Sequence, residues 1–152
     1  MMDLIKNISA REPDFYIRGK DNPYILRWYL TDRVPENYKI YLHHILRDDD
    51  DRALHDHPAD STSIIISGGY IEHFPDDIKI RRAPGQVISR KAEQLHRLEL
   101  YRDLDGNVIP AWTLFTFGPK VRDWGFQCGD RWVPWQQFCD ETDHGKIGRG
   151  CE

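Results

Sequence analysis

The fold of this chain is constrained most by a succession of short segments that favour β-strands. Each segment is rich in aromatic or β-branched residues, and turn-forming residues such as glycine, proline and aspartate separate it from the next. Outside residues 3–8, where Leu4, Ile5 and Ile8 could pack one helical turn onto the rest, helical periodicity is almost absent. We therefore predict an all-β sandwich or barrel. The candidate strands are residues 24–30, 39–47, 54–58, 61–67, 70–74, 78–82, 86–89, 95–100 and 111–117.

The length of 152 residues favours a single domain, which we place at residues 1–138, with a barrel core at about 24–118. The pattern becomes irregular towards both ends of the chain. Residues 124–127 and 131–135 are expected either to add edge strands or to cover one end of the barrel. Residues 139–152 are polar and glycine-rich, so we expect a flexible tail there.

Three histidines stand out as candidate metal ligands. In an extended segment, residues two apart share a face, so His55 and His57 are expected to point inward and Asp56 outward. His96, in the segment 95–100, is the best candidate for a third imidazole. Neutral imidazole suits zinc, iron, nickel and copper. The alternative is two exposed loop histidines and one structural histidine.

These residues resemble the motifs of the cupins, written G-x5-H-x-H-x3,4-E-x6-G and G-x5-P-x-G-x2-H-x3-N. His55 and His57 match the H-x-H, Gly68 or Gly69 closes the first motif, and Gly85 precedes His96 by the required distance. The resemblance implies a cupin-type double-stranded β-helix, the jelly-roll barrel, over roughly residues 39–118. The remaining motif positions hold other residues, namely Asp49, Ser61 or Thr62, Lys91, Glu93 and Leu100.

The missing glutamate of the first motif affects the chemistry that the resemblance implies. Three neutral imidazoles leave the full charge on a divalent ion and leave coordination positions open. Such a site resembles those of the thiol dioxygenase branch of the cupins, which hold Fe(II). We therefore expect a divalent metal ion, with Fe(II) favoured and Zn, Ni or Mn as alternatives.

Side chains near these histidines are candidates for binding a substrate. Arg52 and Arg90 are expected on loops near the mouth of the barrel, where they could clamp a carboxylate or phosphate. Ser61 could hydrogen-bond a metal-bound water, and Tyr70 could border the cavity. We expect none of the other histidines to be a ligand, although one of them could face the barrel interior as its strand neighbours do: His43, His44 and His73, of which His44 is the one expected inside.

Two functions compete at this stage. The first is a metal-dependent enzyme, such as a three-histidine Fe(II) dioxygenase that acts on a small polar molecule. The second is a non-catalytic barrel that binds or senses a small ligand and keeps a structural or vestigial metal site. Sugar-nucleotide epimerisation, also found on this fold, ranks lower because it usually relies on a histidine with a carboxylate base. The sequence identifies no catalytic residue.

Composition limits the partners and the location. A net charge of -4 argues against nucleic acid, and no apolar run approaches the length of a membrane span. Without an apolar leader, a cytoplasmic location is expected, where the three cysteines would be reduced. Cys128 and the tail residues Cys139, His144 and Cys151 could be read as a zinc site, but they lack the close pair typical of such sites. The acidic run 48–51 is expected to be a solvated loop, and exposed edge strands would permit a homodimer.

Overall fold

The computed structural model describes residues 2–34, 36–49, 52–139 and 148–152. The all-β prediction is confirmed: strands dominate, and the two helices are short. No described helix has the length and apolar character that a membrane span needs. In chain order the elements are α1 (Met2–Ser9), β1 (Phe15–Ile17), β2 (Ile25–Tyr29), β3 (Lys39–Ile45), β4 (Leu54–His55), β5 (Ser61–Ser67), β6 (Tyr70–His73), β7 (Lys79–Arg82), β8 (Val87–Arg90), β9 (Arg97–Leu100), β10 (Ala111–Phe117), β11 (Gly125–Cys128), β12 (Arg131–Pro134) and α2 (Trp135–Phe138).

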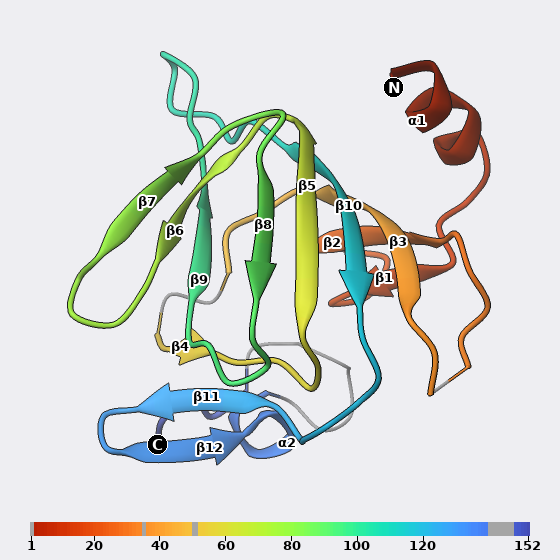
Figure 1. The fold of residues 1–152 in the computed structure, drawn as a ribbon. Coiled ribbons are helices and arrows are strands. Elements are labelled where there is room, and N and C mark those ends of the chain that lie inside the picture. Colours follow the sequence, from red (N-terminus) through yellow and green to blue (C-terminus); the bar gives the residue numbers. More distant parts are fainter. Residues whose placement is uncertain (1, 35, 50–51, 140–147) are drawn as a thin grey trace.

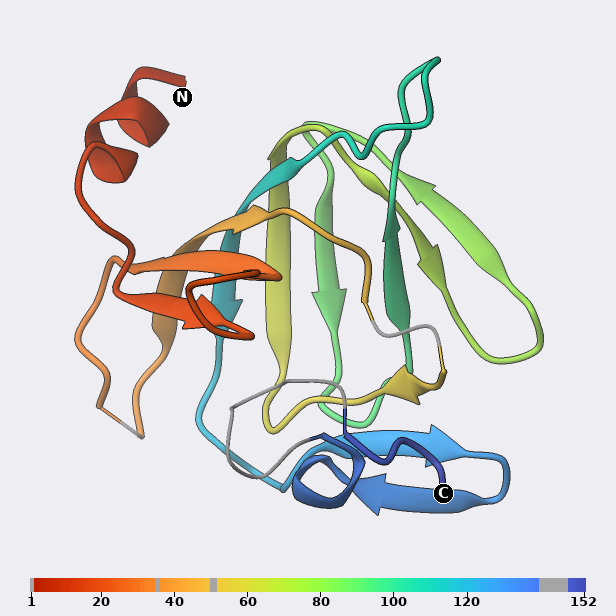
Figure 2. The ribbon, with the colours of Figure 1, turned by 180° about the vertical axis from the view of Figure 1, so that it is seen from behind.

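Two antiparallel sheets form the walls of the barrel. The larger sheet has six strands in the order β1-β2-β3-β10-β5-β8, and the smaller has three in the order β7-β6-β9 (Figures 1 and 2). The main apolar core contains residues from both sheets. Its buried members are Tyr24, Ile25, Ile45, Ile65, Tyr70, Ile88, Leu100 and Ala111.

Alternation along the central strands decides which side chains enter the barrel. His43 on β3 and its partner Thr113 on β10 are buried, and both line the interior cavity. His44 lies on the outer face, where its ring stacks on Trp112 with 4.0 Å between centroids. The expectation that His44 faces the interior is therefore wrong. Leu42 shares the face of His44 and packs outward beneath α1. His43, which lies between these two residues in the sequence, is therefore the histidine that enters the barrel.

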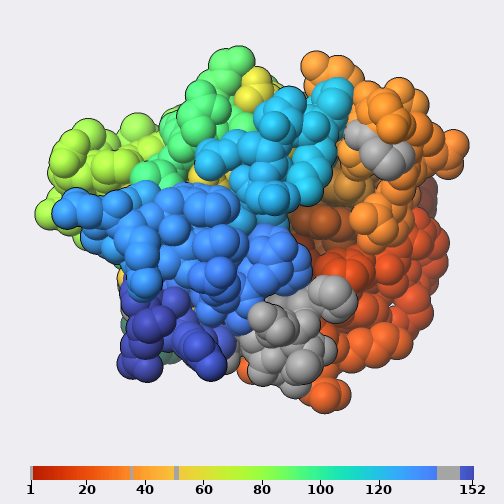
Figure 3. Space-filling view, turned by 90° about the horizontal axis from the view of Figure 1, so that it is seen from below, coloured from red at the N-terminus to blue at the C-terminus, as the bar shows by residue number. Residues whose placement is uncertain are grey.

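A third sheet, in the order β12-β11-β4, crosses one end of the barrel. We call residues 122–138, with β11, β12 and α2, the cap. The cap has its own small core, formed by Ala53, Phe126, Val133 and Phe138. Seen from below, the cap (blue) lies over part of that end of the molecule, beside the red and orange N-terminal part (Figure 3). Of the two arrangements predicted for this segment, the structure shows the cover rather than additional strands at a barrel edge.

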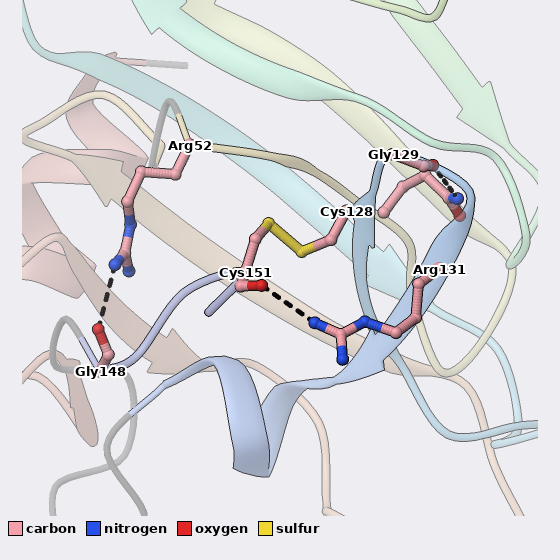
Figure 4. Close-up of a disulfide and its surroundings, with 7 residues drawn as sticks. Arg52, Cys128, Gly129, Arg131, Gly148 and Cys151 are labelled. Carbon is pink, nitrogen blue, oxygen red and sulfur yellow. Dashed lines mark hydrogen bonds between the residues drawn. A yellow bond between two sulfur atoms is a disulfide. The ribbon is translucent and has the colours of Figure 1, made fainter.

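The cap is also where the chain ends. Cys128 and Cys151 form a disulfide with 5.4 Å between their Cα atoms, which corrects the expectation of three reduced cysteines (Figure 4). Arg131 donates to the carbonyl of Cys151 at 2.9 Å. Most of the predicted tail, including His144, lies outside the described residues. The described residues 148–152 of the predicted tail are attached to the cap. Cys128 and Cys151 are too far apart in the sequence for their spacing to have predicted the disulfide.

Candidate metal centre

The structure brings together the three histidines that the sequence singled out. The candidate ligand atoms of His55, His57 and His96 all lie within 4.8 Å of one another. The Nε2 atoms of His57 and His96 are 2.8 Å apart. His96 is buried, and the other two side chains are partly buried at the cavity wall.

Backbone pairing explains why the imidazoles converge. His55 and His96 are directly opposite each other in an antiparallel bridge, and they exchange two backbone hydrogen bonds of 2.9 and 3.0 Å. Side chains of such opposed residues project from the same face. The strand β4 ends at His55, but the chain stays extended enough for His57 to line the same cavity while its amide bonds to Ala92 at 2.8 Å.

The geometry and chemistry of this donor set fit a divalent metal ion. Two nitrogens bound to one ion at about 2.1 Å lie roughly 3.0–3.4 Å apart for coordination angles between about 90° and 109°. The spacing of the two Nε2 atoms, 2.8 Å, is close to that range, so small movements would suffice. Neutral imidazoles are required, and burial lowers the pKa of both His55 and His57 well below 6.5.

Glu72 fixes the orientation of His96. The side chain of Glu72 is fully buried, and its Oε1 accepts from His96 Nδ1 at 2.7 Å. With its proton on Nδ1, a neutral His96 presents the lone pair of Nε2 to the cluster, as metal ligands do when a carboxylate supports them. Burial by itself would raise the pKa of Glu72, but hydrogen bonds from His96 and Arg90 outweigh it and hold that pKa at about 2.

The rest of this network neutralises the buried carboxylate. Arg90 Nε donates to Glu72 Oε1 at 2.5 Å, and Arg82 Nε donates to Oε2 at 2.7 Å. Arg90 also donates to Ser63 Oγ at 3.1 Å and to Tyr70 Oη at 3.3 Å. All three donor groups of Arg90 are therefore engaged by the protein.

A second carboxyl group lies on the other side of the cluster. Asp49 Oδ2 accepts from the Leu98 amide at 2.6 Å and is 4.0 Å from His55 Nδ1, too far for a direct hydrogen bond. Burial raises the pKa of Asp49 to about 7, with partial compensation from the Leu98 amide. Asp48 likewise accepts from the Leu100 amide at 2.7 Å. Asp48 and Asp49 are thus attached to the barrel, which corrects the expectation of a solvated loop for these two residues, and the other two residues of the run, 50–51, lie outside the described part of the chain.

The cluster opens into a cavity of about 380 Å³, a size typical of sites for small molecules. Apolar and aromatic side chains make up much of its wall, including Phe115 and Phe117 of β10. Trp124 and Trp135 of the cap also line it, with their rings parallel and 5.8 Å apart. The cap therefore closes the end of the cavity at which the histidines lie.

The four residues predicted to bind substrate have different positions. Arg90 and Tyr70 line the cavity, but Arg90 is buried on β8 rather than on a loop. Ser61 is buried without lining the cavity, and its hydroxyl has no hydrogen-bond partner among the described residues. Arg52 is directed at the chain end, where it donates to the Gly148 carbonyl at 3.0 Å (Figure 4), so the prediction that it lies at the mouth is wrong. The next residue, Ala53, is the one that enters the cap core.

Sequence reasoning missed other polar residues of the cavity. Arg27, His43 and Asp49 all line it. Arg27 could have been noticed as a charged residue inside a strand of apolar and aromatic residues. The role of Glu72 had no local signal, because its partners come from three separate parts of the chain.

Comparisons with known proteins support the fold. No protein-family model and no curated protein sequence matches the chain. A conserved protein with a double-stranded β-helix domain from Klebsiella pneumoniae subsp. pneumoniae MGH 78578 is 19% identical, with 73% of this chain and 90% of that chain covered and a TM-score of 0.51. A Ralstonia eutropha JMP134 protein, provisionally named a mannose-6-phosphate isomerase, is 19% identical over 70% of this chain and 92% of its own, with a TM-score of 0.52. The structure of FeII HppE gives 13% identity, 71% and 57% coverage, and a TM-score of 0.54.

At such low identities the likeness defines the fold and not an activity. The chain has the double-stranded β-helix fold of the cupins, as the motif resemblance implied, and this fold carries a three-histidine cluster.

Proposed function

We propose that the protein is a metal-dependent cupin enzyme that oxidises a small polar molecule with oxygen, with His55, His57 and His96 as ligands of an Fe(II) ion. The observation that carries this proposal is the convergence of three imidazoles, one buried and two partly buried and all with lowered pKa values, at one end of the cavity. When bound, such an ion would supply Lewis acidity and one-electron chemistry. The fold of FeII HppE, an iron protein by its name, agrees with this choice.

The residues of the chain have distinct tasks in this scheme. Glu72 keeps the Nε2 lone pair of His96 directed at the cluster. Trp124 and Trp135 keep bulk water from the histidines. Asp49, with a pKa of about 7, is placed to exchange a proton with a bound molecule near His55.

Elemental analysis and oxygen consumption test this proposal directly. Protein purified without a histidine tag should hold about one divalent ion per chain, and His96→Ala should lose it. His44→Ala is the matched control, because His44 stacks on Trp112 outside the barrel. The iron-loaded protein should consume oxygen with one or more members of a panel of thiols, amino acids and phenols. A fully loaded protein that is inactive across the panel would contradict the oxidase.

A ligand-binding barrel without catalysis is the second candidate. The observation in its favour is that the charged groups beside His96 are fully used by one another, as the bonds of Glu72 and Arg90 show. This candidate predicts that His96→Ala lowers stability in step with metal loss while no turnover exists to be lost.

A further inference from the structure

The cavity contains a second arginine, Arg27, which the metal centre does not use. Arg27 on β2 lies directly opposite His43 on β3, so the two side chains share a face, and both line the cavity. Arg27 Nε donates to His43 Nε2 at 2.8 Å. The guanidinium lies 4.5 Å from the centroid of the Tyr41 ring, and His43 stacks on Phe115 at 4.9 Å. These contacts hold the guanidinium in a defined plane.

The pair carries one positive charge that no acidic side chain among the described residues balances. His43 accepts at Nε2, so its proton is on Nδ1, and burial together with Arg27 lowers its pKa well below 6.5. Burial also lowers the pKa of Arg27. Within the described part of the chain, Arg27 makes no ion pair, and its terminal Nη atoms donate to no protein acceptor.

The contrast with Arg90 shows that this arrangement is not required by the fold. Arg27 is partly buried and Arg90 is fully buried, and the protein supplies Arg90 with Glu72, Ser63 and Tyr70. A buried charge is costly unless it is paired and hydrogen-bonded. Arg27 is therefore the cavity arginine whose planar pair of Nη donors is available to a bound anion.

The position of Arg27 relates it to the metal centre. A series of ring contacts leads from His43 through Phe115 and Phe117 to His57, with centroid separations of 4.9, 4.6 and 5.7 Å. The charge of Arg27 also contributes to the lowered pKa of His57. A small molecule in this one cavity could therefore contact Arg27 and the histidine cluster together.

We propose that Arg27, positioned by His43, binds the carboxylate of a small substrate whose apolar part lies along Phe115 and Phe117. One guanidinium matches the single charge and the two parallel oxygens of a carboxylate. A phosphate would bring nearly two negative charges, and His43 is neutral, so one of them would stay unbalanced at this end. The inference rests on the proposed function only in assigning the other end of the substrate to the three histidines.

Titration calorimetry with benzoate and butyrate tests this subsite, with benzamide as the neutral counterpart and phenyl phosphate as the alternative anion. The native protein should bind benzoate in preference to both. Arg27→Gln should weaken benzoate binding about 10- to 100-fold, the usual effect of losing charged hydrogen bonds. Arg27→Lys should retain part of the affinity, because it keeps the charge and loses the planar fork. Arg81→Gln, an exposed arginine over Tyr101, is the matched control and should bind as the native protein does.

Thermal unfolding separates a ligand-binding role from a structural one. If Arg27 serves a ligand, Arg27→Gln and Arg27→Met should melt at or above the native temperature, because a partly buried charge without an acidic partner among the described residues is removed. Benzoate should then raise the melting temperature of the native protein alone. Unchanged benzoate affinity in Arg27→Gln, no benzoate binding by the native protein, or preference for phenyl phosphate would each overturn the proposal.

The same titrations distinguish this proposal from the metal-dependent activity. They are run on the protein after treatment with a chelator and again after loading with Fe(II). If the native protein holds no metal but still binds benzoate through Arg27, the proposed enzyme fails and the carboxylate subsite stands. If metal and oxygen consumption are present but Arg27→Gln binds benzoate normally, the subsite fails alone.

Discussion

Two buried carboxylates, Glu72 in the barrel and Asp56 beneath the cap, are held in different ways. In the barrel, Glu72 accepts hydrogen bonds from three side chains, those of Arg82, Arg90 and His96. Beneath the cap, Asp56 accepts from the Gly125 amide at 2.7 Å and the Trp132 indole at 2.9 Å, and it pairs with Arg122 at 2.7 Å.

The difference lies in what remains when the carboxylate is removed. The Arg90 side chain is 2% exposed, so without Glu72 its charge would stay buried. The Arg122 side chain is 33% exposed, so water can replace Asp56. The barrel centre therefore couples fold stability to the orientation of His96. Asp56, which lies between His55 and His57 in the sequence, instead attaches the cap to the barrel.

Glu72→Gln is the strongest way to break this comparison. The neutral amide leaves Arg90 without its counter-charge, so we expect a loss of about 3–5 kcal/mol in the free energy of unfolding. Metal affinity should also fall by roughly 10- to 100-fold, because one neutral amide oxygen would have to serve the donors of two carboxylate oxygens, so His96 loses its charged orienting acceptor. Urea unfolding and metal titration measure the two effects. Glu99→Gln, which removes an exposed partner of His73, is the control and should change neither by a comparable amount.

Removing the disulfide tests whether residues 148–152 stabilise the cap. The two cysteines are 23 residues apart, and closing a loop of that length is worth about 3 kcal/mol in the chain-entropy account. Cys151→Ser should lower unfolding stability by up to that amount, whereas Cys139→Ser leaves the pair intact. Thiol titration of the denatured protein should find one reactive thiol before reduction and three after it, as the count of three cysteines requires. Three thiols before reduction would show that the disulfide is absent.

Asp56→Asn tests the fastening of the cap itself. The amide keeps one acceptor oxygen but loses the charge that faces Arg122 and the Trp132 indole, so we expect a loss of about 2 kcal/mol. Because Asp56 binds residues of β11 and β12, amide exchange should accelerate in these two strands more than in β3 and β10. Asp60→Asn is the control, since Asp60 pairs with Lys91 at the surface. Equal acceleration throughout the barrel would contradict a local role.

The barrel was predictable from sequence to a degree that the cap was not. The alternating runs at residues 61–67 and 111–117 form β5 and β10 over the same residues. Strand β1, with three residues, was too short to be recognised. In the cap, the strands at 125–128 and 131–134 follow the predicted segments closely, but nothing local indicated that Asp56 holds them over the histidines.

The candidate site divides in the same way. Spacing two apart placed His55 and His57 on one face, and the motif distance placed His96 with them. The charged groups around them could not be predicted, because burial decides their roles. His43 and His44 are adjacent in the sequence and equally polar, yet outward packing of Leu42 beneath α1 sends one into the cavity and the other onto Trp112.

The barrel and the cap are also expected to differ in how their stability depends on pH. The barrel buries neutral histidines, whereas the described residues of the cap include none. Burial holds the pKa of His43 well below 6.5, so the unfolded chain binds a proton there before the folded protein does. Above about pH 6.5, His43 therefore does not reduce the free energy of unfolding. As the pH falls below that value, the free energy of unfolding decreases, by about 1 kcal/mol at pH 5.5. Asp49, with a raised pKa of about 7, acts in the opposite sense, because its contribution is lost as the pH rises towards 7.

His43→Gln separates the two contributions in protein freed of metal by a chelator. Glutamine offers an oxygen that can still accept from Arg27 Nε, so the fold and the Arg27 contact should survive. The variant should lose about 1 kcal/mol less than the native protein between pH 7.5 and pH 5.5, because one buried group no longer takes up a proton on unfolding. His44→Gln should show nearly the same difference over this range, because burial lowers the pKa of His44 to about 4 and so keeps it almost fully neutral at pH 5.5 as well. Identical pH profiles for native protein and His43→Gln would mean that His43 is already protonated in the folded barrel, and Arg27 would then need another acceptor.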